Sequence, residues 1–416
     1  MKILHLNRAD INEGAARGVY WLNRALLAAG VESTMLVQKK LSHDFSVLGP
    51  ETIFQKAINT LYSELDGIPL FFYKNRKSSL FSPAWITSPI QGRIKQINPD
   101  IINLHWICKG LLKPESLAKL NKPIVWTLRD MWGFTGGCHY SENCLKYREE
   151  CGACPQLGSK RKNDLSKQLW LRKQKAWQEL NLIIVTLSNW LADCAKQSSL
   201  FQNKRIEVIH NGIDELKFKP IPKSVARDIL NLPQNKKIIL FGAIDATKDE
   251  RKGFQYLVSA VQKLSHCGLK ENTELLIFGS SKPKESPNLG IKANYMGRLY
   301  DDPAIAITYV SADVTVIPSL QEAFGKTALE SLACGTPVVS FDSTGLKDIV
   351  EHEKNGYRAK LYSSDDLARG IAWVLQNEHR WQILSQRARA KVVNEFTIKA
   401  QAAKYLDIYQ EILEKS

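Results

Sequence analysis

Residues 313–341 read DVTVIPSLQEAFGKTALESLACGTPVVSF, and they set a pattern that recurs along the chain. The apolar run 313–317 ends at Pro318, which predicts a short buried strand. The segment 325–333 has helical spacing, and a second apolar run rich in Val follows at 337–341. A strand, a helix and another strand within about 30 residues are typical of a parallel sheet with crossover helices.

The same alternation extends outward in both directions. In the second half, strands are also predicted at 236–242 and 273–278, with a helix at 253–265. In the first half, strands are predicted at 2–7, 33–37, 100–104, 123–127 and 182–186, and helices at 15–29, 88–97, 165–179 and 188–197. Two such series predict an α/β chain of two Rossmann-like, doubly wound domains.

The length of the chain also favours two domains. Its 416 residues exceed the roughly 250–300 at which a single hydrophobic core usually stops growing. A short strand and then Asn211-Gly212, Pro220 and Pro222 mark turns near 208–222, so we expect domains at 1–207 and 208–396. The last periodic segment has one apolar helical face, and we expect 397–416 to pack back on the first domain.

Basic residues are concentrated in the first half. Residues 1–205 contain 29 Lys and Arg against 16 Asp and Glu, whereas residues 206–416 contain 28 against 26. A basic surface attracts anionic membranes, pyrophosphate-linked molecules and nucleic acid through the same electrostatics. The near-neutral second half and the paired glutamates described below disfavour nucleic acid. We therefore expect an anionic membrane surface as a partner of the protein.

The apolar runs bear on the cellular location of the protein. The first run turns polar after Asn7, which suits a buried strand rather than a signal peptide. No stretch has the ~20 apolar residues of a membrane span. We therefore expect a cytoplasmic protein, peripheral on the inner face of the plasma membrane.

The loops that follow strands hold the candidate site residues, because ligands of open α/β sheets bind beyond the carboxyl ends of the strands. The first loop carries Gly14 before a helix, where backbone N–H groups can approach an anion. A plain strand-to-helix turn is the alternative there. The loop after 236–242 carries Arg251 and Lys252, a planar fork and a point charge that suit a diphosphate.

The third loop adds two carboxylates. Glu322 lies before the predicted helix, and Glu330 lies within it, about 8 Å along if the helix starts at Gly325. The two could hold the ends of one extended ligand. The N–H groups near Phe324 and Gly325 would face a phosphate between them.

These residues carry a family resemblance. Glu322-AFGKTAL-Glu330 with SLACGTPVV after it resembles the signature of retaining glycosyltransferases of family four, which have the GT-B fold. VIHNGID at 208–214, RKGF at 251–254, IFG at 277–279 and YMGRL at 295–299 follow in the family's order. TLRDMWGFTGGCHYSENC and then CGACP, within 127–155, resemble a subgroup of bacterial surface-polysaccharide biosynthesis. The resemblance implies two domains that face each other across a cleft, with the acceptor bound to the first and the nucleotide-sugar to the second.

The resemblance also implies residue roles. Glu322 would bind hydroxyls of the donor sugar, Glu330 would bind the ribose, and Lys252 would neutralise the leaving diphosphate. Arg251 would assist Lys252, although the family's Arg lies several residues earlier, where this chain has Asp245 and Ala246. The donor-binding set is completed by Gly14, Asn211, Phe324 and Gly325.

The candidates for the cleft on the first domain are His105, Arg129 and Asp130. Arg129-Asp130 stands where the family has His-Asp, so the role of Arg129 is altered or the donor lies differently. A packed structural histidine is the alternative interpretation of His105. The same-face mechanism of the family needs neither a protein general base nor a catalytic metal, so no catalytic cofactor is expected.

Four cysteines fall within 17 residues: Cys138, Cys144, Cys151 and Cys154. Four thiolates can form a closed tetrahedral zinc site that holds an irregular loop, although the first spacings are longer than in short zinc knuckles. Free thiols and redox pairing are the alternatives to structural zinc.

The expected function is retaining transfer of a hexose from a UDP- or GDP-linked donor to a saccharide acceptor, lipid-linked through a polyprenyl pyrophosphate, in cell-surface polysaccharide biosynthesis. A nucleotide-sugar 2-epimerase of similar two-domain fold is the alternative enzyme. A non-catalytic phosphate- or nucleic-acid-binding module is favoured by charge alone, whereas the near-neutral second half and the paired glutamates disfavour it.

Overall fold

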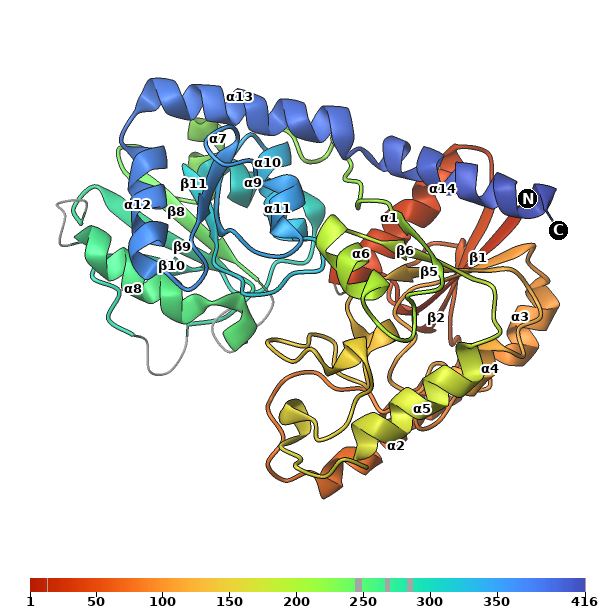
Figure 1. Ribbon diagram of the computed structural model, residues 1–416. Helices are drawn as coiled ribbons and strands as arrows, with labels where there is room; N and C mark the ends of the chain where they lie inside the picture. Colours follow the sequence, from red (N-terminus) through yellow and green to blue (C-terminus); the bar gives the residue numbers. More distant parts are fainter. Residues whose placement is uncertain (13, 244–248, 266–269, 283–286, 416) are drawn as a thin grey trace. The chain divides into compact units, whose positions relative to one another are not determined.

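The chain forms two compact units in the computed structural model, which describes residues 1–12, 14–243, 249–265, 270–282 and 287–415 (Figure 1). Unit 1 comprises Met1–His210 and Gln401–Ser416, and unit 2 comprises Asn211–Ala400. Asp245 and Ala246, named above, lie outside the described residues.

Unit 1 is built on a seven-stranded parallel sheet in the order β3-β2-β1-β4-β5-β6-β7. Its strands are β1 (Lys2–Ala9), β2 (Glu32–Lys39), β3 (Val47–Leu48), β4 (Ile101–Leu104), β5 (Ile124–Leu128), β6 (Leu182–Thr186) and β7 (Arg205–Val208). β1 pairs with β2 on one side and β4 on the other, so that His5 lies opposite both Met35 and Asn103. The strand order reverses direction between β1 and β4.

The helices of unit 1 lie between these strands in the sequence, except for α14, which follows unit 2. They are α1 (Gly14–Ala28), α2 (Ile53–Asp66), α3 (Gln91–Ile97), α4 (Pro114–Leu117), α5 (Leu165–Trp177), α6 (Asn189–Lys196) and α14 (Ile398–Glu414), with 3₁₀ turns η1 (Ile68–Phe72), η2 (Trp132–Phe134), η3 (Lys146–Arg148) and η4 (Pro155–Leu157). From Gln401 onward α14 belongs to unit 1, where the Tyr409 hydroxyl accepts from Asn103 Nδ2 at 2.6 Å and the Tyr405 hydroxyl lies 2.9 Å from Thr127 Oγ1. The buried tyrosines thus join the end of the chain to β4 and β5.

Unit 2 is built on a six-stranded parallel sheet in the order β10-β9-β8-β11-β12-β13. Its strands are β8 (Lys237–Gly242), β9 (Thr273–Phe278), β10 (Lys292–Tyr295), β11 (Val314–Ile317), β12 (Val338–Phe341) and β13 (Gly356–Ala359). The central strands are apolar on both faces because helices cover both sides of the sheet. Here the strand order reverses between β8 and β11.

The helices of unit 2 are α7 (Lys223–Ile229), α8 (Phe254–Leu264), α9 (Asp302–Ser311), α10 (Lys326–Ala333), α11 (Leu346–Ile349), α12 (Ser364–Leu375) and α13 (Glu378–Glu395), with the 3₁₀ turn η5 (Glu250–Lys252). α8 packs against α12, whereas α10 packs against α9 and α13 (Figure 1). Residues 313–341 therefore contain β11, α10 and β12, a strand-helix-strand unit at the centre of the domain.

The structure confirms the predicted α/β class with two Rossmann-like domains. The division falls between His210 and Asn211, compared with the expected 207 and 208. The predicted helix at 88–97 is shorter, because α3 starts only at Gln91. None of the helices in the described residues combines the length and the apolar character needed to span a membrane.

Candidate active site

The central candidate site lies where the strand order of unit 2 reverses. The loops that follow β8 and β11 leave neighbouring strands at the same edge of the sheet, which is where ligands of doubly wound folds bind. η5 lies in the first of these loops, and Glu322 lies in the second. The topology therefore explains how residues 70 positions apart in the sequence come together.

The two loops are packed directly on one another. The carbonyl of Arg251 accepts from the N–H of Leu320 at 2.8 Å. Gly253 has φ of +72°, and a Cβ added there would lie 1.9 Å from the carbonyl oxygen of Pro318. Only glycine allows both this backbone conformation and this close approach.

This packing places two cations at one carboxylate. Lys252 Nζ donates to Glu322 Oε1 at 2.5 Å, and Arg251 Nη1 lies 3.5 Å from the same oxygen. Burial would raise the pKa of Glu322, but the charges of Lys252 and Arg251 outweigh burial and lower the pKa of this carboxyl. Glu322 is therefore held ionised at neutral pH.

Arg251 and Glu322 are fixed by further contacts. Arg251 Nη1 donates to the carbonyl of Gln321 at 2.8 Å, and Arg251 Nη2 donates to Asp249 Oδ2 at 2.9 Å. The Glu322 N–H donates to Thr344 Oγ1 at 2.9 Å, and the Glu322 carbonyl accepts from the N–H of Gly345 at 3.0 Å. The loop after β12 thus fixes the backbone of Glu322, through contacts that the motif alone did not predict.

Glu330 lies one turn into α10 and is buried. Its Oε2 accepts from the Tyr309 hydroxyl at 3.1 Å, and its Oε1 lies 3.5 Å from Lys326 Nζ. Sequence reasoning assigned no role to Tyr309 or Lys326. The i,i+4 spacing of Lys326 and Glu330 could have indicated their pairing, whereas Tyr309 comes from α9 and could not.

Phe324 and Gly325 shape the start of α10. The Phe324 ring is buried and packs edge-on against Phe396, with ring centroids 5.9 Å apart. Gly325 has φ of +110°, and a Cβ there would lie 2.5 Å from Leu346 Cδ2. Any contact of Phe324 with a ligand would therefore come from its backbone, as expected.

In unit 1, His105 follows β4 directly and is buried. Its Nε2 lies 3.0 Å from His5 Nδ1, and its Nδ1 lies 3.2 Å from Arg129 Nη2. Burial lowers the pKa of His5 to about 3 and that of His105 well below its usual value, and the charge of Arg129 adds to both shifts. His5 was not predicted as a site residue, because only the pairing of β1 with β4 brings it near His105.

Arg129 and Asp130 are adjacent in sequence but differ in their partners. Burial lowers the pKa of Arg129 to about 10. Asp130 Oδ2 accepts from Trp106 Nε1 at 2.9 Å and lies 2.7 Å from His139 Nδ1. Burial would raise the pKa of Asp130, but His139 and the N–H donors around the carboxyl lower it. Asp130 thereby ties the segment after β5 to His139.

Lys173 on α5 supports the same segment. Its Nζ donates to the carbonyls of Trp132 and Thr135, the latter at 3.0 Å, and lies 3.5 Å from the centroid of the Trp132 ring. Burial lowers the pKa of Lys173 to about 7. Sequence reasoning missed this residue, which looks like any other lysine of an amphipathic helix.

Gly14 and Asn211 occupy different places. Gly14 is the exposed first residue of α1, and a Cβ added there would meet no atom within 4 Å. The turn before it is anchored by Asp10, whose carboxylate accepts from the N–H groups of Leu41 and Ser42. Asn211 is buried at the first position of unit 2.

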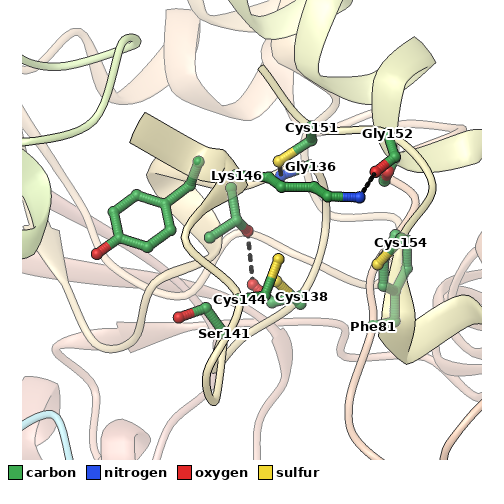
Figure 2. Close-up of a pocket in the computed structure, with 12 residues that line it drawn as sticks. Phe81, Gly136, Cys138, Ser141, Cys144, Lys146, Cys151, Gly152 and Cys154 are labelled. Atoms are coloured by element: carbon green, nitrogen blue, oxygen red, sulfur yellow. Dashed lines mark hydrogen bonds between the residues drawn. The ribbon is translucent and has the colours of Figure 1, made fainter. Parts of the chain in front are cut away.

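All four clustered cysteines line one cavity of unit 1 (Figure 2). They are free thiols, and Cys151 Sγ accepts from the N–H of Gly136 at 3.1 Å. Burial and the neighbouring Cys151 and Cys154 raise the pKa of Cys138 well above its usual value. In the described part of the chain, no group of three or more His, Cys, Asp or Glu is placed so that it could hold a metal ion. As arranged, the cysteines do not form a ligand set, and structural zinc stays a prediction.

Comparison with known families agrees with this architecture. Residues 12–215 match the family described as Glycosyltransferase Family 4, and residues 223–391 match the family described as Glycosyl transferases group 1. The chain belongs to the GT-B glycosyltransferases. The two matches correspond to most of unit 1 and most of unit 2, so both domains of this transferase fold are present.

Two curated relatives illustrate the similarity. The chain is 29% identical over 251 residues to the uncharacterized glycosyltransferase MJ1607 of Methanocaldococcus jannaschii. This match covers 56% of this chain and 60% of that protein. It is 24% identical to the putative colanic acid biosynthesis glycosyl transferase WcaC of Escherichia coli, over 75% of each protein. The matches to the D-inositol 3-phosphate glycosyltransferases span only about half the length of those relatives.

A solved structure shows the same fold over the full length. Sucrose-phosphate synthase from Thermosynechococcus elongatus aligns with a TM-score of 0.73 and 20% identity, covering 100% of both chains. These findings support a glycosyltransferase and give no support to the epimerase alternative.

Proposed function

We propose that the chain transfers a hexose from a UDP- or GDP-linked donor to a saccharide acceptor, with retention of configuration at the anomeric carbon. The observation that carries this proposal is the packing of η5 on the loop before α10, which sets Lys252 2.5 Å and Arg251 3.5 Å from Glu322. An ionised carboxylate beside two cations at a topological switch point suits a ligand with sugar hydroxyls at one end and a diphosphate at the other.

The cations act on the leaving group. As the bond to the anomeric carbon breaks, negative charge develops on the departing diphosphate, and Lys252 and Arg251 stabilise it electrostatically. Because the surrounding contacts already fix Arg251, little reorganisation is needed when this charge appears. Glu322 accepts hydrogen bonds from donor-sugar hydroxyls.

The remaining donor contacts follow the same scheme. Glu330 accepts from the ribose, the backbone N–H groups of Phe324 and Gly325 approach the phosphates, and Gly14 and Asn211 complete the donor site. The departing phosphate takes the proton of the acceptor hydroxyl, so no side chain serves as general base. No catalytic metal is invoked, and activity is expected to survive treatment with a chelator.

Unit 1 would bind the acceptor, near His105, Arg129 and Asp130. The acceptor is a saccharide linked to a polyprenyl pyrophosphate, because the excess of basic residues in this unit favours both the pyrophosphate and an anionic membrane. We place the reaction in surface-polysaccharide biosynthesis, at the cytoplasmic face of the plasma membrane. The name of the WcaC relative, a putative colanic acid biosynthesis glycosyl transferase, supports the biosynthetic part of this proposal.

Donor hydrolysis and transfer test the proposal. Purified protein is incubated with UDP- and GDP-hexoses, and the variant Glu322→Gln is compared with Glu353→Gln, an exposed carboxylate of the same unit. We expect Glu322→Gln to lower activity by about 10²–10³-fold, the usual cost of removing one group that binds the transition state, and Glu353→Gln to retain it. Full activity of Glu322→Gln would contradict the proposal, as would a product with inverted anomeric configuration.

A further inference from the structure

The surface of α2 and η1 exposes several large apolar side chains. Ile53 is 87% exposed and Phe54 is 74% exposed, and at the other end Phe71 and Phe72 are 80% and 83% exposed. We call this surface the apolar ridge; its members are Ile53, Phe54, Leu61, Leu65, Ile68, Phe71 and Phe72. Such large side chains are normally buried, so a cluster of them indicates a surface that meets an apolar partner.

The ridge follows from how α2 is held. Asp66 is the buried residue of α2, and its Oδ1 accepts from the N–H groups of Trp85 at 2.6 Å and Ile86 at 3.2 Å. Asn59 Nδ2 donates to the carbonyl of Gln38 in β2 at 3.1 Å. These polar contacts attach the helix to the rest of unit 1, whereas the large apolar residues of the ridge remain exposed at the surface.

The sequence of α2 gives the exposed residues a common face. Ile53, Leu61 and Leu65 recur at intervals of four and eight residues, which places them on one side of a helix. A complete capping box of Thr52 and Gln55 fixes the start of this helix. The ridge is thus a formed amphipathic element rather than a frayed loop.

Cations lie beside the apolar residues. Lys56 is exposed on α2, and Lys74, Arg76 and Lys77 follow η1 immediately, with Lys77 paired to Glu142 at 2.6 Å. Glu51 and Glu64 are the exposed acidic residues of this region. Unit 1 as a whole contains 31 Lys and Arg against 20 Asp and Glu in residues 1–210 and 401–416. The exposed Trp85 adds an indole next to the end of α2.

We propose that the apolar ridge is the surface through which this chain docks on an anionic lipid bilayer. Amphipathic helices with aromatic and aliphatic residues on one face and cations nearby lie in the membrane interface, and indoles are enriched at that depth. The net positive charge of unit 1 is complementary to anionic headgroups. This docking surface rests on the membrane association of the proposed function and on no other part of that function.

Vesicle co-sedimentation tests the ridge. The full chain is mixed at low salt with vesicles of phosphatidylcholine containing phosphatidylglycerol, and separately with vesicles of phosphatidylcholine alone. The ridge variant is Phe71→Ser/Phe72→Ser, and the control is Leu216→Ser/Ile229→Ser, which removes two exposed apolar side chains from unit 2. All four side chains are exposed, so both variants are expected to fold.

Wild type and the control should bind the anionic vesicles, and the ridge variant should bind at least about tenfold more weakly. Equal sedimentation of the ridge variant and wild type would overturn the proposal, as would equal binding of wild type to both kinds of vesicle. A wild-type dimer that dissociates in the ridge variant would assign the ridge to a second copy of the chain instead.

Donor hydrolysis without lipid separates this inference from the proposed chemistry. The ridge variant should hydrolyse the donor in solution at the wild-type rate, because none of its changes touches unit 2. Loss of vesicle binding with hydrolysis intact therefore supports docking, whereas loss of hydrolysis in the ridge variant would contradict the assignment of the ridge to membrane contact alone.

Discussion

At the scale of single residues, burial and charge oppose one another at Glu322 and act together at His5 and His105. Burial raises the pKa of Glu322, yet the pKa is lowered because Lys252 and Arg251 lie within 3.5 Å. At His5 and His105 the cation Arg129 acts in the same direction as burial, and both imidazoles stay neutral. Burial and nearby cations therefore keep Glu322 ionised in unit 2 and keep His5 and His105 neutral in unit 1.

The neutral histidines predict how stability depends on pH. The pKa of His5 is about 3 in the folded chain and about 6.5 when unfolded, so between these values the unfolded chain binds the extra proton. Stability should therefore fall as the pH falls through this window, by about 1.4 kcal/mol per pH unit for this group. Urea denaturation at a series of pH values measures the slope.

The matched variants for this measurement are His5→Asn and His379→Asn. His5→Asn removes the buried imidazole and should flatten the dependence of stability on pH between about 6 and about 4. His379 is exposed on α13, so His379→Asn should keep the wild-type slope. An unchanged slope in His5→Asn would show that His5 does not titrate as the structure indicates.

Sequence reasoning identified residues of the site unevenly. Glu322, Glu330 and Lys252 could be named because they belong to short motifs with fixed spacing. Their partners Tyr309 and Thr344 come from other elements, and only the folded chain brings them together. For the same reason the sequence did not reveal that Asp130 is engaged by His139 and Trp106.

At the scale of elements, the junction of η5 with the loop before α10 depends on one glycine. Gly253→Ala would introduce a Cβ 1.9 Å from the Pro318 carbonyl oxygen at a φ of +72°. We expect a marked fall in melting temperature and a loss of donor hydrolysis, because the junction must open and Lys252 must move away from Glu322. Thermal unfolding and hydrolysis assays measure the two effects.

Gly297→Ala is the matched control for this prediction. Gly297 has a φ of +68°, but a Cβ there would meet no atom within 4 Å. This variant therefore carries the backbone strain of about 1–2 kcal/mol without the steric clash. Equal effects of the two substitutions on stability and hydrolysis would refute the role given to the close approach at Gly253.

A structural zinc ion bound by the cysteine cluster stays a prediction. Spacing suggested structural zinc, and the four thiols do line one cavity, but they are not placed as a ligand set. If zinc is part of the fold, metal analysis of protein purified without a chelator should find about one Zn per chain. A content below about 0.2 Zn per chain would reject it.

Periodicity predicted most sheet strands because buried parallel strands are continuous apolar runs. It gave no prediction for α2, whose apolar residues do not enter the core. It also did not identify the very short β3 or the long, mostly polar α13, where few buried residues mark the helix. Weak core burial accounts for these three omissions, but α9, α12 and β13 were also not predicted although they contribute buried residues.

At the scale of the whole molecule, unit 1 is formed by two separate parts of the chain, with unit 2 between them in the sequence. The chain enters unit 2 at Asn211 and returns to unit 1 at Gln401, where Tyr405 and Tyr409 are buried against β4 and β5. The single apolar face of 397–414 was enough to predict a packed helix. Its polar partners Asn103 and Thr127 could not be predicted, because they are about 300 residues away.

The central claim is that residues 251–253 and 322–330 of unit 2 bind the activated sugar, and a crystal structure of the chain with UDP or GDP, whichever donor hydrolysis selects, tests it most directly. We predict the diphosphate within hydrogen-bonding distance of Lys252 Nζ and the start of α10, with the ribose at Glu330. A nucleotide bound in unit 1, or in unit 2 away from these two segments, would contradict the account.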